Sequence, residues 1–380
     1  MNSCGALGAG VNWCREAVEG SVCRIVSPPR RSVEWTEPHF PSANRHSTDD
    51  RGVSVGSADK RRSSALVTIL MCTYNGCAHI NEQLRSLAGQ THDNWQLVAS
   101  DDGSTDDTVS RLIKFASQKG RDRVELRYGP RTRGISSAVV EPREHAARNY
   151  LSLVTDRTIS GDYFAYCDQD DSWAADKLER ALAWLSTVPD HVPALYGSRT
   201  RIVRETGEPY GLSPLFAKSP HFRNALVQSL AGGNTMVFNS AGRDLLAAAG
   251  NLRVASHDWW TYLLVTGGGG LVHYDRVPSI NYRQHNQNLV GANQDLNAML
   301  RRLELVMGGA WARWMDLNLM ALRCSAHLLT PENRHLLEEL MHRRSGSWAA
   351  RLGILTRLGL FRQTSRGQLA LGLAVVAGRL

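Results

Sequence analysis

The sequence predicts an α/β protein with a mainly parallel, Rossmann-like sheet flanked by helices. Three short apolar runs, 66–71, 95–99 and Val124–Tyr128, have the length and composition of buried strands. Helical patterns at Ile80–Ala88 and 108–118 separate these runs. Strands that alternate with helices form parallel sheets, because each helical crossover returns the chain to the same edge. Ligands of such sheets bind beyond the carboxyl ends of the strands.

Three regions follow from composition and pattern. Residues 1–64 are rich in Ser, Arg, Pro and Gly, and we expect them to be disordered. Residues 65–292 hold the predicted strands, including a fourth at Tyr163–Cys167 and a hairpin-prone one at Ala194–Val203. Helical patterns dominate residues 293–380, which we expect to form a helical, basic and amphipathic C-terminal extension.

The basic charge is concentrated at the C-terminus. The formal net charge is +8, and residues 341–380 contain seven arginines and no acidic residue. Between residues 351 and 362, arginines alternate with apolar residues at helical spacing, which fits peripheral contact with an anionic membrane. A core-packed helix with a solvated basic face is the alternative. Aromatic residues do not interleave with the arginines, so we expect no nucleic-acid partner.

The cysteine spacing and the lengths of the apolar runs indicate the cellular compartment in which the protein is expected. Seven cysteines at irregular spacing form no zinc or disulfide framework, which favours a reducing compartment. No run of about 18 apolar residues is present, and the N-terminus lacks an apolar signal core. We therefore expect a cytoplasmic protein.

The most informative motif is Asp168-Gln169-Asp170-Asp171, directly after a predicted strand. Carboxylates crowded at a strand end raise one another's pKa unless a cation compensates them. Mg²⁺ or Mn²⁺, which prefer oxygen ligands, would do so. A solvated acidic turn is the alternative.

Two further groups of polar residues follow predicted strands. Asp102 and the run Thr73-Tyr74-Asn75 stand at the same expected edge of the sheet, where a carboxylate can accept the imide N–H of a uracil or thymine. The alternative for Asp101-Asp102-Gly103-Ser104 is a turn that caps the next helix.

The later part of the chain contains three residues with side chains suited to group transfer: Asp258, Arg283 and His285. Asp258 precedes an apolar run and is followed by Trp259 and Trp260. Two indoles would partly desolvate the carboxylate and raise its pKa, as a general base requires, and they could stack on a sugar. The alternative is a helix N-cap. Arg283 could clamp a diphosphate, and His285 could bind phosphate or complete a metal shell, although a lone histidine is more often structural.

Taken in chain order, the motifs resemble family-2 glycosyltransferases with a GT-A fold. The resemblance rests on VTILMCTYNG at 67–76, DDGSTD at 101–106 and DQDDSW at 168–173. Further motifs are similar to the bacterial rhamnosyltransferase-type branch: GGNTMVFN at 232–239, HDWW at 257–260 and YRQH at 282–285. The resemblance covers residues 65–292. Asn286 stands where the family usually has glycine, and the link from 133 to 147 is longer than usual.

The resemblance implies an inverting, metal-dependent transfer from a nucleotide-diphosphate sugar. It places the nucleotide at Thr73, Tyr74, Asn75, Asp102 and Asp168, the metal at Asp168 and Asp170, and the diphosphate at Arg283 and His285. Asp258 would be the catalytic base, and the sugar pocket would contain Trp173, Asn234, Trp259 and Trp260. The implied donor is dTDP-rhamnose, and the acceptor a cell-surface polysaccharide or lipid-linked glycan at the inner face of the cytoplasmic membrane.

Other functions remain open from the sequence. A transferase of the same fold could use a UDP-hexose, because no motif separates a deoxyhexose pocket from a hexose pocket. A sugar-1-phosphate nucleotidylyltransferase would need a Gly-rich, basic loop after the first strand, where this chain has Thr73-Tyr74-Asn75-Gly76. A non-catalytic, membrane-associated scaffold that keeps the fold is the alternative from another class.

Overall fold

The structure is a computed structural model that describes residues 64–120, 122–131, 141–284 and 309–380. Residues 1–63 of the predicted N-terminal segment, and the domain boundary predicted at 292/293, lie outside the described residues. All described residues belong to one compact unit, 61–380.

The first half of the sheet is parallel and is built as the sequence predicts. Its strands, in spatial order, are β3 (Val124–Tyr128), β2 (Trp95–Asp101), β1 (Val67–Thr73) and β4 (Tyr163–Cys167). The connecting helices are α3 (Ile80–Ala88), α4 (Thr108–Lys119) and α5 (Pro142–Thr155). Pro142 stands in the first turn of α5, where its missing N–H costs no hydrogen bond.

The second half of the sheet mixes directions. Beyond β4 the order continues with β8 (Val237–Asn239), β6 (Ala194–Val203), β9 (Leu271–Arg283) and β5 (Ser172–Trp173), while β7 (Pro209–Leu212) pairs with β6. The β6–β9 pair is parallel, whereas β8 is antiparallel to both β4 and β6. β6 and β7 form an antiparallel hairpin, which confirms the prediction for 194–203.

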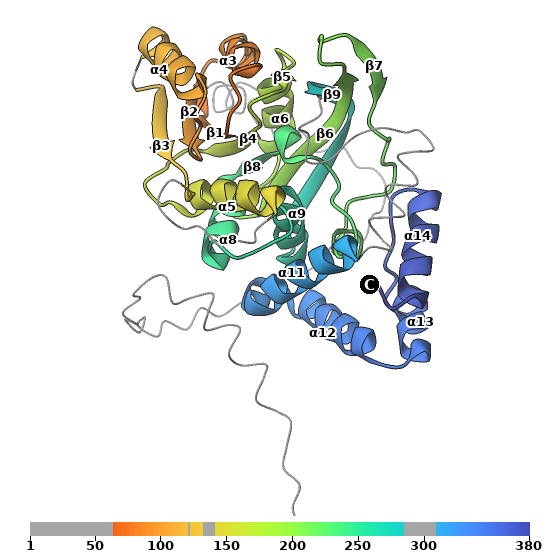
Figure 1. Ribbon diagram of the computed structural model, residues 1–380. Coiled ribbons are helices and arrows are strands. Elements are labelled where there is room, and N and C mark those ends of the chain that lie inside the picture. The colour runs from red at the N-terminus through yellow and green to blue at the C-terminus, as the bar shows by residue number, and fades with distance from the viewer. Residues whose placement is uncertain (1–63, 121, 132–140, 285–308) are drawn as a thin grey trace, which may run out of the picture. The chain divides into compact units, whose positions relative to one another are not determined.

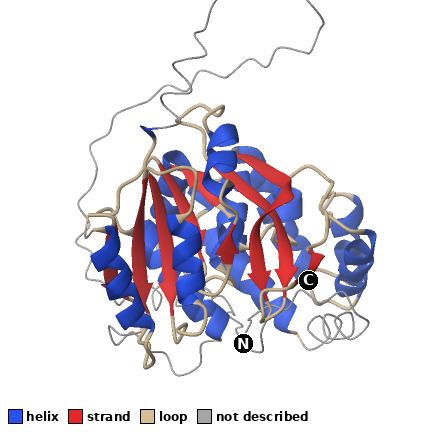
Figure 2. Ribbon diagram, turned by 90° about the horizontal axis from the view of Figure 1, so that it is seen from above, coloured by secondary structure: helices blue, strands red, loops and turns tan. Residues whose placement is uncertain are grey.

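Helices cover both faces of this sheet (Figure 2). One core cluster joins the inner faces of α3, α4 and α6 (Lys177–Leu185) to the sheet. The other lies under α5, α8 (Ser240–Ala249) and α9 (His257–Gly267). The short α7 (Phe222–Ala225) and the 3₁₀ turn η1 (Gly233–Thr235) lie between β7 and β8 in the chain. The predicted α/β class is confirmed.

The C-terminal extension is helical, as predicted, and shares the second core cluster. It contains α11 (Ala310–Cys324), the 3₁₀ turn η2 (Ala326–Leu328), α12 (Pro331–Ser345), α13 (Trp348–Thr356) and α14 (Ser365–Val376). Trp311, Met315 and Leu337 pack in the same cluster as Trp259 of α9, so these helices are fixed on the sheet domain (Figure 1). None of the described helices has the length and apolar composition needed to cross a membrane.

The pattern of arginine and apolar residues at 351–362 does not form one helix. α13 ends at Thr356, and Leu358 and Leu360 are buried in the core. Gly359 has φ = 61°, a left-handed conformation that lets the chain leave the helical direction between these two leucines. The amphipathic helix expected there is therefore a short helix followed by an anchored loop.

Candidate active site

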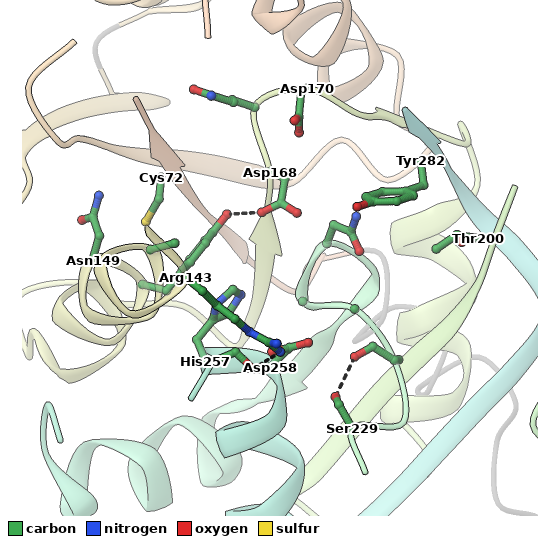
Figure 3. Close-up of a pocket in the computed structure, with 18 of the residues that line it drawn as sticks. Cys72, Arg143, Asn149, Asp168, Asp170, Thr200, Ser229, His257, Asp258 and Tyr282 are labelled. Atoms are coloured by element: carbon green, nitrogen blue, oxygen red, sulfur yellow. Dashed lines mark hydrogen bonds between the residues drawn. The ribbon is translucent and has the colours of Figure 1, made fainter. Parts of the chain in front are cut away.

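A cavity of about 960 Å³ opens at the carboxyl ends of the parallel strands. Eight of the residues that the sequence analysis selected line it: Thr73, Tyr74, Asn75, Asp102, Asp168, Asp170, Asn234 and Asp258. Figure 3 shows Asp168 and Asp170 on one side, with Asp258 and His257 below them. The structure thus brings residues from five separate motifs into one cavity.

At the edge formed by β1 and β2, the two predicted roles of the Asp101-Asp102 pair belong to different residues. Asp101 makes the turn: it accepts hydrogen bonds from Ser104 N at 2.8 Å, Ser104 Oγ at 2.6 Å and Thr73 Oγ1 at 2.8 Å. Asp102 lines the cavity instead, accepts from Arg131 N at 2.8 Å, and has a pKa raised by burial. Asp102 is therefore the carboxylate available to a ligand.

The loop after β1 is tied to the acidic motif. Gln169 accepts from Tyr74 N and donates to Tyr74 O, both at 2.9 Å, like a partner in a short strand pair. A Cβ at Gly76 would collide with the Gln169 side chain, so glycine is needed for this close approach. Asn75 takes φ = 48°, and its Oδ1 accepts from Thr105 N at 2.8 Å. Gln169 thus links the expected nucleotide and metal sides of the cavity.

The acidic motif places three carboxylates close together. Ligand atoms of Asp168, Asp170 and Asp171 lie within 4.8 Å of one another. Burial, and then the neighbouring charge of Asp170, raise the pKa of Asp168 to about 7. Burial also raises the pKa of Asp171, which accepts hydrogen bonds from Asn234 Nδ2 at 2.5 Å and Arg283 N at 3.2 Å. Carrying negative charge on all three carboxyls at this strand end is therefore costly, as the raised pKa values of Asp168 and Asp171 indicate.

These residues fit a divalent cation with oxygen ligands. Asp168 and Asp170 line the cavity and present carboxylate oxygens to it, as Mg²⁺ or Mn²⁺ requires. Asp171 is 1% exposed and does not line the cavity, so it holds the framework of the motif. The pair that the sequence analysis selected is the pair that faces the cavity.

On the opposite side of the cavity, the first turn of α9 contains the predicted base, Asp258. Ser256 is its N-cap residue and Asp258 lies in its first turn, lining the cavity, so Asp258 is not the cap. Its neighbour His257 is buried, which lowers its pKa to about 4 and keeps the imidazole neutral. The ring of His257 stacks on Tyr150, and its Nε2 has no hydrogen-bond partner among the described residues.

Residues 68–156 match the family model described as "Glycosyl transferase family 2". The chain carries a family 2 glycosyltransferase domain. The GT-A type of fold expected from the resemblance agrees with its mixed, mostly parallel sheet.

Two bacterial relatives of this glycosyltransferase are similar in sequence. A dTDP-rhamnosyl transferase, RfbG of Shigella flexneri, is 29% identical over 247 residues, which are 62% of this chain and 78% of the relative. The UDP-Glc:alpha-D-GlcNAc-diphosphoundecaprenol beta-1,3-glucosyltransferase WfgD of Escherichia coli is 29% identical over 133 residues, 35% of this chain and 45% of the relative. The chain thus spans less than half the length of the second relative.

Solved glycosyltransferase structures also align with the chain. TarS 1-349 of S. aureus in complex with UDP-GlcNAc aligns with 15% identity and a TM-score of 0.44, over 73% of this chain and 87% of that solved chain. The mannosyltransferase PcManGT from Pyrobaculum calidifontis, in complex with GDP-Man and Mn²⁺, aligns with 18% identity and a TM-score of 0.40, over 82% of this chain and 85% of that one.

The structure of this glycosyltransferase places Trp173 outside the predicted sugar pocket. Trp173 is 5% exposed, and the Nζ atom of Lys177 lies 3.2 Å from the centroid of its ring. Lys177 itself is fully buried, donates to Asn234 O at 2.6 Å, and has a pKa lowered to about 7 by burial. Trp173 therefore shields a buried lysine behind the acidic motif. Lys177 could not be selected from the sequence, because a lysine in an amphipathic helix pattern usually faces solvent.

The indoles beside Asp258 do not line the cavity either. Trp260 is fully buried, and Trp259 is 4% exposed with its Nε1 donating to Ala225 O at 2.6 Å. α9 is buried along nearly its whole length, so the two consecutive indoles both enter the core. The expectation that they stack on a sugar is therefore wrong for this structure. Asn234, by contrast, lines the cavity, and its buried Oδ1 lacks a partner within the described chain.

Arg283 is not positioned as a diphosphate clamp. It is 3% exposed and does not line the cavity. Its guanidinium donates to Glu82 Oε2 at 2.5 Å and to Glu205 O at 2.5 Å. The Arg283 side chain instead joins β9 to α3. His285, the second residue predicted for the diphosphate, lies outside the described residues.

Several cavity residues on α5 were not selected from the sequence. Tyr150 donates to Asp168 Oδ1 at 2.7 Å, and Arg143 donates to Ser256 Oγ at 2.9 Å. Arg143 and His145 bring basic groups to the wall of the cavity. The weak helical pattern before residue 146 hid them, although Pro142 followed by charged residues is a recognisable start of a helix.

Proposed function

We propose that this protein is an inverting, metal-dependent glycosyltransferase that moves rhamnose from dTDP-rhamnose to a hydroxyl group of a cell-surface polysaccharide or lipid-linked glycan precursor. One observation carries the proposal: Asp168 and Asp170 face the same cavity as Asp258. A pair of metal-ligating carboxylates and a separate carboxylate base are the groups that transfer from a nucleotide-diphosphate sugar requires.

In this proposal Asp258 deprotonates the acceptor hydroxyl as that oxygen attacks the anomeric carbon of the donor. The bond from that carbon to the diphosphate oxygen breaks on the opposite side, so the configuration inverts. Asp258 lines the cavity at the first turn of α9, and Arg143 fixes the start of this helix through Ser256 Oγ. These contacts hold the base in a defined orientation, which a proton transfer in the transition state needs.

Asp168 and Asp170 would hold Mg²⁺ or Mn²⁺, which when bound neutralises charge that develops on the leaving diphosphate. On the nucleotide side, Asp102 accepts the imide N–H of the base, with Thr73, Tyr74 and Asn75 forming the adjoining wall. Asn234 offers its unpartnered Oδ1 to a sugar hydroxyl. This hydrogen bond would satisfy a buried acceptor that is otherwise costly.

The donor sugar has two candidates. The similarity to a protein named as a dTDP-rhamnosyl transferase, over 62% of this chain, favours dTDP-rhamnose. A UDP-hexose is the second candidate, because WfgD, which is similar over 35% of the chain, is named for a UDP-Glc donor. We place the reaction at the inner face of the cytoplasmic membrane, where a lipid-linked acceptor and a nucleotide sugar would meet.

A thermal-shift panel of dTDP-rhamnose, UDP-glucose and UDP-GlcNAc, each with Mn²⁺ or with EDTA, tests this proposal. A ligand that binds only the folded state raises the melting temperature by linkage. Mn²⁺-dependent stabilisation by dTDP-rhamnose supports the full proposal, and stabilisation by a UDP-sugar alone replaces the donor. If no nucleotide sugar shifts the melting temperature, the chain is better explained as a non-catalytic scaffold.

A further inference from the structure

The last helix, α14, carries an apolar stripe on its outer side. Leu369, Leu373 and Val376 are 68%, 55% and 67% exposed. Their spacing puts them on one side of a helix, because each residue turns the helix by about 100°. The residues of α14 that are buried, Leu371, Ala374 and Val375, occupy the opposite side. α14 is therefore apolar on both its core-facing and its solvent-facing sides.

The neighbouring helix, α13, also exposes apolar side chains. Trp348 and Leu352, four residues apart on α13, are 72% and 38% exposed. α13 packs against α14, because Arg351 lies against Gly378 and Leu355 lies against Gly372. We define the outer apolar surface as Trp348, Leu352, Leu369, Leu373 and Val376.

Exposed arginines stand close to this surface in the chain, with no acid between them. Arg357 follows α13, Arg366 lies in the first turn of α14, and Arg379 follows α14; all three are exposed. Residues 341–380 contain no Asp or Glu. A second copy of the chain would bring these positive charges together, so the charge opposes self-association through this surface.

The surface is also connected to the cavity. Lys218 donates from its Nζ to Arg362 O at 2.8 Å and from its backbone N to Gln363 Oε1 at 3.0 Å, just before α14. The segment that leads to Lys218 contributes Pro214 and Phe216 to the cavity wall, with the exposed Leu215 between them. The loop before α14 is thus hydrogen-bonded to the chain segment that contributes Pro214 and Phe216 to the cavity wall.

We infer that the outer apolar surface docks onto an anionic lipid bilayer, with its leucines, Val376 and Trp348 entering the interface and the arginines at the headgroups. Exposed apolar side chains beside basic residues bind such interfaces through apolar burial and attraction to anionic lipid. This inference deepens the proposed function, because docking through α14 would bring the adjoining cavity wall toward a lipid-linked acceptor. The binding itself needs neither donor nor metal.

Flotation of the full-length chain with lipid vesicles tests the inference. We expect binding to vesicles that contain phosphatidylglycerol, weaker binding to pure phosphatidylcholine, and loss of binding in high salt. Leu369→Ser with Leu373→Ser should lower the partition coefficient at least about tenfold, because two leucines no longer enter the interface. Arg366→Gln should lower it about fivefold on anionic vesicles only.

Matched controls remove similar groups elsewhere. Ile113 and Val277 are 57% and 58% exposed, so Ile113→Ser with Val277→Ser removes comparable apolar surface; Lys114→Gln removes an exposed charge on α4. Neither control should change vesicle binding. The inference would be overturned if the control variants lost as much vesicle binding as the α14 variants, or if the wild-type chain did not bind vesicles. A wild-type dimer that Leu369→Ser with Leu373→Ser converts to monomer would also overturn it. Because no donor is present, either result is independent of the proposed transfer.

Discussion

The ring of Tyr150 stacks on the imidazole of His257, with the two ring centroids 3.9 Å apart and the planes inclined by 26°. The hydroxyl of the same tyrosine donates to Asp168 at 2.7 Å. Asp168 belongs to the proposed metal side of the cavity, and His257 precedes the proposed base, Asp258. One buried aromatic residue on α5 therefore sets the position of both sides of the site relative to each other.

The raised pKa of Asp168 predicts that the stability of the folded protein depends on pH. Its pKa is raised from 3.8 to about 7 in the folded chain, so the folded state favours the protonated carboxyl. The contribution of this group to stability is fully present below the unfolded pKa and is lost as the pH rises through about 7. Ionising this carboxyl in the folded chain at high pH therefore costs on the order of a few kcal/mol at most.

Urea denaturation in EDTA, with the wild type and Asp168→Asn compared at about pH 5 and about pH 8, measures this effect. The free energy of unfolding of the variant relative to the wild type should rise with pH. Added Mn²⁺ should reverse the trend for the wild type, since metal binds the ionised carboxylate. A difference between the two proteins that does not change with pH would show that Asp168 does not cause the pH dependence.

Asp170→Asn should weaken Mn²⁺ binding by about 100-fold or more, because it removes a negative oxygen ligand that faces the cavity. Isothermal titration with Mn²⁺ in the presence of the nucleotide gives the affinity. Asp176→Asn is the matched control, since Asp176 follows the same motif but its side chain is 52% exposed. Unchanged Mn²⁺ affinity in Asp170→Asn would remove this carboxylate from the metal site.

Gly233→Ala should destabilise the protein by about 1–3 kcal/mol and reduce transfer, because a Cβ there would collide with Nε2 of His257. Gly211→Ala is the control, since a Cβ at that glycine meets only Ile202, at 4.0 Å. Combining Gly233→Ala with His257→Ala should cost less than the sum of the two single changes. Strict additivity in thermal denaturation would mean that the two residues do not interact.

Arg283→Gln separates the role expected from the sequence from the role that the contacts indicate. Glutamine cannot keep the hydrogen bonds of the buried guanidinium to Glu82 Oε2 and Glu205 O, so the free energy of unfolding should fall by about 3 kcal/mol. Donor affinity should change less than about threefold. Arg201→Gln, on the neighbouring strand β6 and exposed, is the control. A stable variant that loses donor affinity would restore the diphosphate clamp.

The sequence predicted the parallel half of the sheet and the side chains at its edge. Period and turn residues are local signals, so β3 and β4 have the predicted bounds and Asp168 faces the cavity. The prediction that Trp259 and Trp260 line the sugar pocket was wrong, because it depended on the surroundings of the helix. Consecutive residues of a helix point in different directions, and only the surroundings of α9, which bury nearly all of it, decide where they lie.

The burial of charged side chains also could not be predicted from local sequence patterns. Lys177 and Arg283 are polar residue types that usually face solvent, and their burial depends on partners from distant parts of the chain: Asn234 O for Lys177 and Glu82 for Arg283. The outer side of α14 shows the reverse case, in which leucines typical of a core are exposed. Such departures mark the places where tertiary contacts or a partner outweigh residue type.

The central claim is that Asp258 is the base of a metal-dependent transfer, and the release of nucleoside diphosphate from dTDP-rhamnose and from UDP-glucose tests it most directly. Water serves as the acceptor, and the wild type is compared with Asp258→Asn, each with Mn²⁺ or EDTA. The wild type should release diphosphate from one donor only with Mn²⁺, and the variant should be slower by about 10²–10⁴-fold while it keeps its donor affinity. Asp244→Asn, with a side chain 73% exposed, should behave as the wild type. Release that is unaffected by Asp258→Asn, or absent for both donors with Mn²⁺, would contradict the account.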